Sequence, residues 1–355
     1  MCGPRSAGSG PFTIPGVNRR ILTLLAALLP VVVFGALLTA VTVPFVSLGP
    51  GPTFDTLGTV DGKQVVDIQG TPTRATSGQL NMTTVSQRDG LTLGEALALW
   101  LSGREQLMPR DLVYPPGKSR EEVDEDNDAE FRTSEQSAEY AALGYLRYPS
   151  AVTLAEVHDP GPSVGALQRG DAVDAVDGEP VYTVEQFTKR LSATKPGETV
   201  TIDYRRKNAA PGTARITLGE NKDRPNGFLG VSVLDAPWAP FTVEFNLANI
   251  GGPSAGLMFS LAVVDKLSTG TLAGQNFIAG TGVIKPNGQV DSIGGITHKM
   301  IAAREAGATV FLVPAENCYE ARSDPNGLQL IKVDSLAQAV DALRTLTGGG
   351  QPPSC

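Results

Sequence analysis

The segment Ala248-Asn249-Ile250-Gly251-Gly252-Pro253-Ser254-Ala255-Gly256 joins two apolar stretches in the last third of the chain. The stretch before it, 241–247, predicts a β-strand, whereas 255–267 predicts a helix because its apolar residues recur on one face. Ser254 is therefore expected where a glycine-rich turn enters a helix. Free N–H groups at a helix start can stabilise developing negative charge, and glycines let a carbonyl group approach closely.

A serine hydroxyl is a poor nucleophile without a base, and the chain has only two histidines that could serve as one. His158 lies far from Ser254 in the chain, and His298 lies beside Lys299 on a helix predicted at 297–306. Neighbouring helix positions point about 100° apart, so at most one of this pair faces a given site. We interpret His298 as a surface residue. Lys299, in an apolar setting that would lower its pKa, is the remaining candidate base.

Several short motifs surround these two residues in a fixed order. They are Gly252-Pro253-Ser254-Ala255-Gly256, Thr281-Gly282-Val283-Ile284, Gly288-Gln289-Val290, Ile293-Gly294-Gly295 with Lys299, Ala302-Ala303 and Phe311-Leu312-Val313-Pro314. In order and approximate spacing, the region 241–346 resembles the proteolytic domain of Lon proteases. The resemblance implies that Ser254 is the nucleophile, Lys299 the general base and Thr281 a supporting hydroxyl. It also implies an oxyanion hole of backbone N–H groups, with the candidates Gly251, Gly252, Ser254 and Ala255.

A second unit, 152–233, alternates short strands and turns around one predicted helix at 184–191. Its motifs are Leu167-Gln168-Arg169-Gly170-Asp171, Val176-Asp177-Gly178 and Pro196-Gly197-Glu198-Thr199-Val200. With these motifs the unit resembles a PDZ domain of the bacterial protease type. Such domains bind an extended peptide as an added strand beside a helix, which here would be 184–191. The alternative is a PDZ fold that only supports its neighbour.

Two positions depart from the Lon pattern. Val283 stands where Lon proteases usually have a glutamate, and Gly251 stands where they often have an acidic residue. Both changes remove carboxylates, so Lys299 would be left without a counter-ion. They also motivate an alternative function, a catalytically weak or inactive membrane-anchored PDZ scaffold. A tail-specific Ser–Lys peptidase is a further alternative, although its sequence surroundings differ.

The apolar run 21–46 contains no charged residue. As a helix it would be roughly 39 Å long, enough to cross a hydrocarbon layer of about 30 Å with some tilt. Pro30 can be accommodated within such a span. The alternatives are a cleaved signal peptide, with Leu38-Thr39-Ala40 as the exit site, and a buried core helix.

Basic residues set the expected orientation of this anchor. Arg5, Arg19 and Arg20 precede the run, and the next basic residue after it is Lys63. The positive-inside rule then places the N-terminus in the cytoplasm and everything after residue 46 outside the cell membrane.

The three cysteines fall on both sides of the predicted membrane. Cys2 would be cytoplasmic, whereas Cys318 and Cys355 would both lie outside, where disulfides persist. We expect Cys318 and Cys355 to pair. The alternative is two free thiols.

Several functions are disfavoured by composition. The formal net charge of −8 and the lack of a basic stripe argue against nucleic acid as a partner. Gly117-Lys118-Ser119 imitates the end of a P-loop, but Leu112 stands where its first glycine would be, so ATP use is not expected. The sequence has no H-E-x-x-H motif, and neither a metal nor a cofactor is expected.

These observations predict an α+β protein: a transmembrane helix, a mixed α/β N-terminal region wrapping a PDZ-like β-barrel domain, and a C-terminal Lon-type α/β proteolytic domain. The expected boundaries are 1–20 for a cytoplasmic tail, 21–46 for the transmembrane helix, 47–148, 149–235 and 236–355. Within 47–148, the acidic stretch 119–130 is expected as a loop or helix start, and Thr133 as the N-cap of a helix ending at Leu146.

This arrangement resembles the envelope PDZ–Lon proteins of Gram-positive-type bacteria. The expected function is that of an ATP-independent serine endopeptidase, which cleaves unfolded or tailed proteins presented by the PDZ domain. The resemblance also implies a homo-oligomer, for which a hexameric ring is one form.

Overall fold

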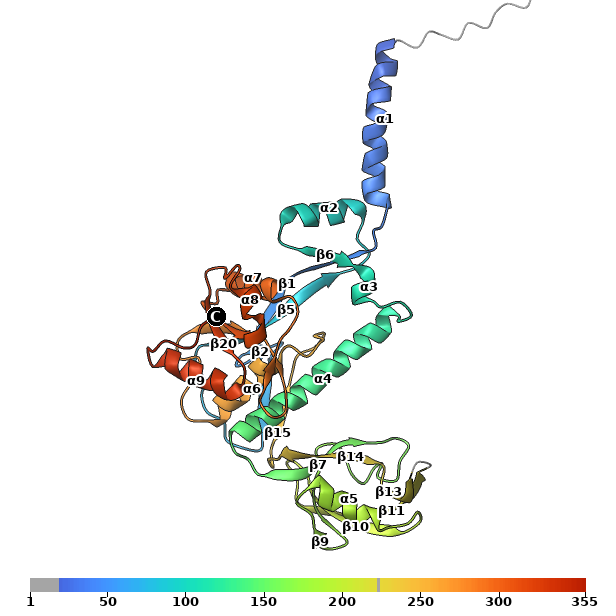
Figure 1. Ribbon diagram of the computed structural model, residues 1–355, viewed down its shortest axis with the longest axis vertical. Helices are drawn as coiled ribbons and strands as arrows, with labels where there is room; N and C mark the ends of the chain where they lie inside the picture. Colours follow the sequence, from blue (N-terminus) through green and yellow to red (C-terminus); the bar gives the residue numbers. More distant parts are fainter. Residues whose placement is uncertain (1–18, 222–223) are drawn as a thin grey trace, which may run out of the picture. The chain divides into compact units, whose positions relative to one another are not determined.

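The computed structural model describes residues 19–221 and 224–355, and the chain divides into two compact units (Figure 1). The first contains the described residues up to Ser47 together with Arg88–Val113. The second contains Leu48–Gln87 and Tyr114–Cys355. The expectations for Cys2 and Arg5 fall outside the described residues.

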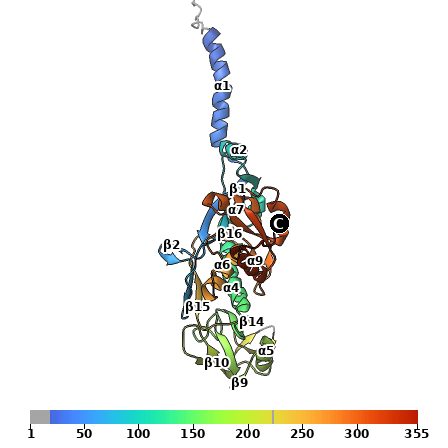
Figure 2. The same cartoon turned by 90° about the vertical axis from the view of Figure 1, so that its left-hand side faces the viewer.

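The first unit is built on the apolar helix α1, Arg19–Ala40, which keeps Pro30 within it. The most apolar 18-residue window within Arg20–Ala40 has a mean hydropathy of 2.7 and none of it is buried, so the helix is compatible with a single-pass membrane anchor. The helix ends before residue 46, because the chain turns into extended structure ahead of Pro44. Helix α2 runs across the end of α1 in Figure 1 and lies at the same end of α1 in Figure 2. The other elements of this unit are α2 (Leu93–Ser102), β6 (Gln106–Pro109) and α3 (Arg110–Val113).

The main sheet of the second unit joins distant parts of the chain. Its strands lie in the order β20-β19-β16-β5-β1, and the pairs β20–β19, β19–β16 and β16–β5 are parallel. The strands are β1 (Phe45–Asp55), β5 (Gln79–Arg88), β16 (Phe277–Gly280), β19 (Val310–Pro314) and β20 (Gln329–Val333). Two strands of the N-terminal region 47–148, β1 and β5, thus share one sheet with three strands of the C-terminal segment 236–355. The sequence analysis had assigned these two regions to separate parts of the chain.

Helices pack on this sheet around one apolar core. They are α4 (Arg120–Tyr145), α6 (Gly256–Leu267), α7 (Ile296–Ala306), α8 (Cys318–Ala321) and α9 (Leu336–Thr347), with a short 3₁₀ turn at Ala315–Asn317. Helix α6 is buried from Gly256 to Lys266, as expected for a helix that is apolar on nearly all sides. Phe259 of α6 meets Phe131 of α4 edge to face, with 5.8 Å between the ring centroids.

Short strand pairs complete this part of the fold. β15, Thr242–Phe245, lies within the strand predicted at 241–247 and pairs antiparallel with β4, Val66–Gln69. The remaining pairs are β2 (Thr59–Val60) with β3 (Lys63–Gln64), and β17 (Val283–Ile284) with β18 (Val290–Asp291).

Helix α4 begins much earlier than expected. Thr133 lies inside it, so the prediction of Thr133 as an N-cap is wrong. The N-cap is Ser119, whose side chain accepts from the backbone N–H of Glu122 while the Glu122 carboxylate accepts from the N–H of Ser119. This capping box, together with acidic residues in the first turn, makes the stretch 119–130 helical. The apparent P-loop ending at Ser119 is therefore a helix start.

The residues from β7 to β14 form a second sheet with a core of its own. Its order is β11-β10-β8-β7-β14, and β9 pairs with β8. Its strands are β7 (Ser150–Val157), β8 (Ala172–Val176), β9 (Glu179–Pro180), β10 (Thr199–Arg205), β11 (Gly212–Thr217) and β14 (Val231–Pro237). The same segment contains α5 (Val184–Ser192) and a separate antiparallel pair, β12 (Gly219–Asn221) with β13 (Arg224–Phe228). The helix predicted at 184–191 is present as α5, with Phe187 buried in this core.

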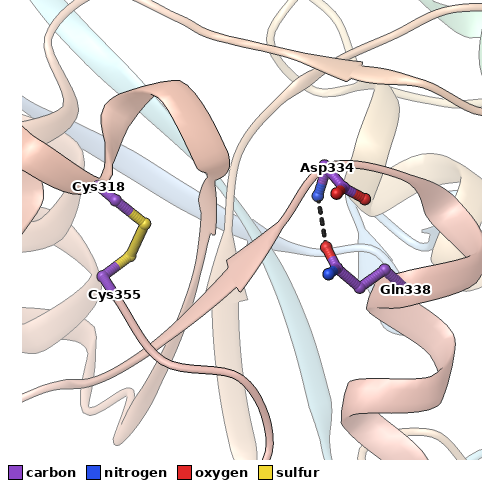
Figure 3. Close-up of a disulfide and its surroundings, with 4 residues drawn as sticks. All are labelled: Cys318, Asp334, Gln338 and Cys355. Carbon is purple, nitrogen blue, oxygen red and sulfur yellow. Dashed lines mark hydrogen bonds between the residues drawn. A yellow bond between two sulfur atoms is a disulfide. The ribbon is translucent and has the colours of Figure 1, made fainter.

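The C-terminal end of the chain is held in two ways. A disulfide joins Cys318, at the start of α8, to Cys355 (Figure 3). Beside it, the N–H of Lys332 in β20 donates to the carbonyl of Pro353 at 3.0 Å. Figure 3 also shows the start of α9, where the backbone N–H of Asp334 donates to the Gln338 side chain at 2.7 Å. The last residues therefore lie along β20.

Replacing Cys355 by serine should destabilise the second unit. A crosslink over 37 residues contributes up to about 4 kcal/mol on the chain-entropy model. We expect a lower denaturant midpoint for the Cys355→Ser full-length chain in detergent. A reductant should lower the midpoint of the wild type and leave that of the variant unchanged. Equal midpoints for the oxidised wild type and the variant would contradict the prediction.

Candidate active site

Ser254 and Lys299 meet at the starts of two helices. Ser254 stands just before α6, and Lys299 lies in the first turns of α7. The Nζ atom of Lys299 donates a hydrogen bond to the Oγ atom of Ser254 at 2.6 Å, across 45 positions of sequence. A lysine amine at this distance can exchange a proton with the serine hydroxyl when its own charge state permits.

Thr281, directly after β16, contacts both residues. Its hydroxyl accepts from Lys299 Nζ at 3.0 Å and donates to the backbone carbonyl of Ser254 at 3.1 Å. The side chain is completely buried. Thr281 therefore orients the lysine amine and holds the backbone at Ser254 at the same time.

Burial determines the electrostatics of Lys299. Only 3% of the residue is exposed, and this desolvation lowers the pKa of its amine from 10.5 to about 8. Within residues 19–221 and 224–355, no carboxylate lies at ion-pair distance from its Nζ atom. Val283, where Lon proteases usually have a glutamate, is on the wall of the same cavity. At pH 7, one unit below this pKa, about a tenth of the amine is therefore neutral.

Helix α4 supports the turn before Ser254 from outside. Its Asn127 carbonyl accepts from the backbone N–H of Gly252 at 2.9 Å, and its Ser134 hydroxyl donates to the carbonyl of Pro253 at 2.8 Å. A Cβ atom on Gly251 would lie 2.8 Å from the Asn127 Cβ, so α4 occupies the space that an acidic side chain would need. Neither Asn127 nor Ser134 belongs to a recognisable motif, and the sequence analysis missed both.

The start of α6 offers donors for an anion. The N–H of Gly252 is already engaged by Asn127, which argues against its predicted part in an oxyanion hole. Within the described part of the chain, the N–H groups of Ser254 and Ala255 have no protein acceptor, and both residues line the cavity. Gly251 lines the cavity too. A developing oxyanion above Ser254 could therefore accept from the N–H groups of Ser254 and Ala255.

A cavity of about 500 Å³ opens in front of Ser254 and Lys299. One wall is the turn 249–255, another is formed by β1 and β5, and a third by the loop before α7. Besides the turn, its lining residues are Pro52, Met82, Thr84, Val85, Val283, Ser292, Ile293, Gly294 and Lys299. The wall from β1 and β5 had no signal in the sequence, because it depends on strand pairing across the chain.

Neither histidine is hydrogen-bonded to Ser254 or Lys299 in the described part of the chain. His298 is 6% exposed, so its interpretation as a surface residue is wrong: α7 is packed against the core on the His298 side as well. His158 directly follows β7, and its Nε2 atom is 3.0 Å from the Ser232 hydroxyl of β14. The described hydrogen bond of the Ser254 hydroxyl is with Lys299.

A second cavity, of about 410 Å³, lies between α5 and the segment that leads into β14. Apolar side chains of α5 form one side, including Val184, Phe187 and Leu191. The backbone of 227–230, Gly227-Phe228-Leu229-Gly230, lines the other side together with Val231. This cavity lies beside α5, where the sequence analysis expected a peptide to bind as an added strand; peptide binding there stays a prediction.

Two protein families match parts of the chain. Residues 249–344 match the Lon protease (S16) C-terminal proteolytic domain, and residues 125–218 match the PDZ domain. The first match contains Ser254, Thr281 and Lys299. The second begins within α4 and ends before β14.

Curated relatives match shorter stretches of the chain. Lon protease 2 of Bacillus subtilis (strain 168) is 31% identical over 94 residues, 26% of this chain and 17% of the relative. Lon protease of Clostridioides difficile (strain 630) is 43% identical over 65 residues, 18% of this chain and 8% of the relative. The chain thus spans less than a fifth of the length of these relatives.

Among solved structures, the PDZ domain of an SdrC-like protein from Listeria monocytogenes is 26% identical. The match covers 23% of this chain and 86% of the solved Listeria chain, with a TM-score of 0.22. The two family matches carry the assignment: the chain contains a PDZ domain and a Lon protease (S16) C-terminal proteolytic domain.

Proposed function

We propose that this chain is an ATP-independent serine endopeptidase, in which Ser254 is the nucleophile and Lys299 the general base. The observation that carries the proposal is the 2.6 Å hydrogen bond between Lys299 Nζ and Ser254 Oγ. The lowered pKa of Lys299, about 8, supports it, because only the neutral amine can accept the hydroxyl proton. The match of this segment to the Lon proteolytic domain supports the same reaction.

The chemistry follows from this pair. Ser254 Oγ attacks the carbonyl carbon of the scissile peptide bond, and its proton moves to Lys299 Nζ. The oxyanion accepts from the N–H groups of Ser254 and Ala255, and Thr281 keeps the ammonium in place. Lys299 then gives its proton to the leaving amine, which leaves an acyl-enzyme. A water molecule, deprotonated by Lys299, hydrolyses the ester and restores Ser254.

Unfolded or tailed proteins are the substrates that fit this arrangement. The cavity in front of Ser254 is about 500 Å³, which suits an extended segment rather than a folded domain. The groove beside α5 could hold a peptide as an added strand and present its chain. ATP independence rests on the sequence, since the one P-loop imitation forms the N-terminal cap of α4.

We propose further that α1 anchors the chain in the cell membrane, with a cytoplasmic N-terminus and extracytoplasmic domains. The length and hydropathy of α1 support the anchor. The disulfide between Cys318 and Cys355 supports the orientation, because disulfides persist in oxidising compartments. By resemblance to Lon-type domains, we propose a homo-oligomer, which sedimentation of the full-length chain would test.

Replacement of either dyad residue should abolish proteolysis. Ser254→Ala and Lys299→Met should each lower the turnover of an unfolded protein substrate about a thousandfold or more. Ser292→Ala, a change in another serine of the same cavity, is the matched control and should retain turnover. Wild-type turnover in Ser254→Ala would reject the proposal. Failure of a fluorophosphonate to label Ser254 in the wild type would favour the scaffold alternative.

Activity should increase with pH through the pKa of Lys299. The neutral amine is the active form, so kcat/KM should fall about tenfold per pH unit below the pKa and level off above it. With the pKa lowered to about 8 by burial, the midpoint is expected near pH 8. Initial rates on a short fluorogenic peptide measure the profile. A profile that is flat or decreases between about pH 6 and about pH 9 would contradict the lysine assignment.

Ser134 should influence the rate without touching substrate. Ser134→Ala removes the hydrogen bond to the Pro253 carbonyl and should lower kcat about tenfold, as expected for one lost buried hydrogen bond, with little change in KM. Ser137→Ala, a buried serine one turn further along α4, is the control. Equal kcat values for the two variants would show that the Ser134 contact does not position the nucleophile turn.

A further inference from the structure

Helix α2 exposes a set of large apolar side chains, Leu93, Leu97, Trp100 and Leu101, here named the apolar face of α2. Their exposed fractions are 36%, 40%, 64% and 69% respectively. Trp100 and Leu101 are thus mostly uncovered in the isolated chain. Contiguous exposed apolar side chains of this size mark a surface that another phase or molecule covers.

The helix is amphipathic. At about 100° per residue, the four side chains of the apolar face fall within an arc of about 100°. Glu95, the only charged residue of α2, points to the opposite side. Its carboxylate accepts from the backbone N–H and the hydroxyl of Thr92, both at 2.8 Å, so it caps the helix. The apolar face therefore carries no charge of either sign.

The start of α2 is joined directly to the end of α1. The N–H of Leu93 donates to the carbonyl of Val41 at 2.8 Å, and the N–H of Val43 donates to the carbonyl of Leu91 at 2.9 Å. A Cβ atom on Gly94 would lie 2.9 Å from the carbonyl oxygen of Leu38, so glycine permits this close approach. Figure 1 shows α2 running across the end of α1.

We propose that α2 lies in the lipid–water interface of the bilayer that α1 crosses, with its apolar face in the acyl-chain boundary. This inference rests on the proposed membrane anchor. The end of α1 near Ala40 marks the edge of the hydrocarbon layer, and α2 is hydrogen-bonded to the residues that follow. Tryptophan favours this depth of a membrane. Since the face has no basic side chain, neutral phosphatidylcholine should suffice as the partner.

Trp100 provides its own probe. The chain has two tryptophans, and the other, Trp238, is buried in the second unit with its indole N–H donated to the Gly170 carbonyl at 3.0 Å. Full-length wild type and Trp100→Phe are reconstituted in phosphatidylcholine vesicles, with and without lipids brominated near the headgroup end of their acyl chains. The variant keeps the apolar face and reports Trp238 alone, so the difference between the two proteins isolates Trp100.

We expect brominated lipid to remove roughly half of the Trp100 emission, which should be blue-shifted, and to leave the variant unchanged. Unquenched, red-shifted Trp100 emission would mean that the face is in water and would overturn the inference. Unquenched, blue-shifted emission would mean that protein, such as a second copy, covers the face, and would overturn it too. Flotation with the vesicles tests the anchor separately, and a chain that fails to float would overturn both the anchor and this inference.

Discussion

The hydrogen bond between Lys299 Nζ and Ser254 Oγ depends on how the rest of the second unit buries the lysine. Lysine is ordinarily charged, and a charged amine cannot accept a proton. Desolvation at 3% exposure lowers its pKa to about 8 and makes the neutral form accessible. The two departures from the Lon pattern are consistent with a buried lysine that has no ion-pair partner among the described residues. Val283 adds no charge beside the amine, and Gly251 leaves room for α4.

Helix α4 connects the two recognised domains. Near its middle, Asn127 and Ser134 hold the turn before Ser254. Two residues beyond Ser134, Gln136 accepts from Arg169 of the PDZ domain at 2.6 Å, and further along the helix Glu139 pairs with Lys207 of the same domain. A single helix thus contacts both the turn before Ser254 and the PDZ domain.

Short-range patterns in the sequence correctly predicted several helices and strands. The strand at 241–247, the helix at 255–267 and the helix at 184–191 were predicted from periodicity, and each is present as β15, α6 or α5. The start of α4 was not fixed although its signal was local: the stretch 119–130 was predicted as a loop or helix start, and the capping box of Ser119 and Glu122 was not recognised. His298 was misplaced because periodicity cannot show that both sides of a helix are packed.

The sequence by itself determined which residue types could form a site. The glycine-rich turn at Ser254, the shortage of histidines and the motif order around Lys299 are all readable without coordinates, as is the uncharged run of α1. Only the tertiary structure decided how these parts are held. The cavity wall from β1 and β5, the supports from α4 and the burial of Lys299 arise from contacts between residues far apart in the chain. Such contacts leave no periodic pattern, since their geometry exists only after the strands have paired and the helices have packed.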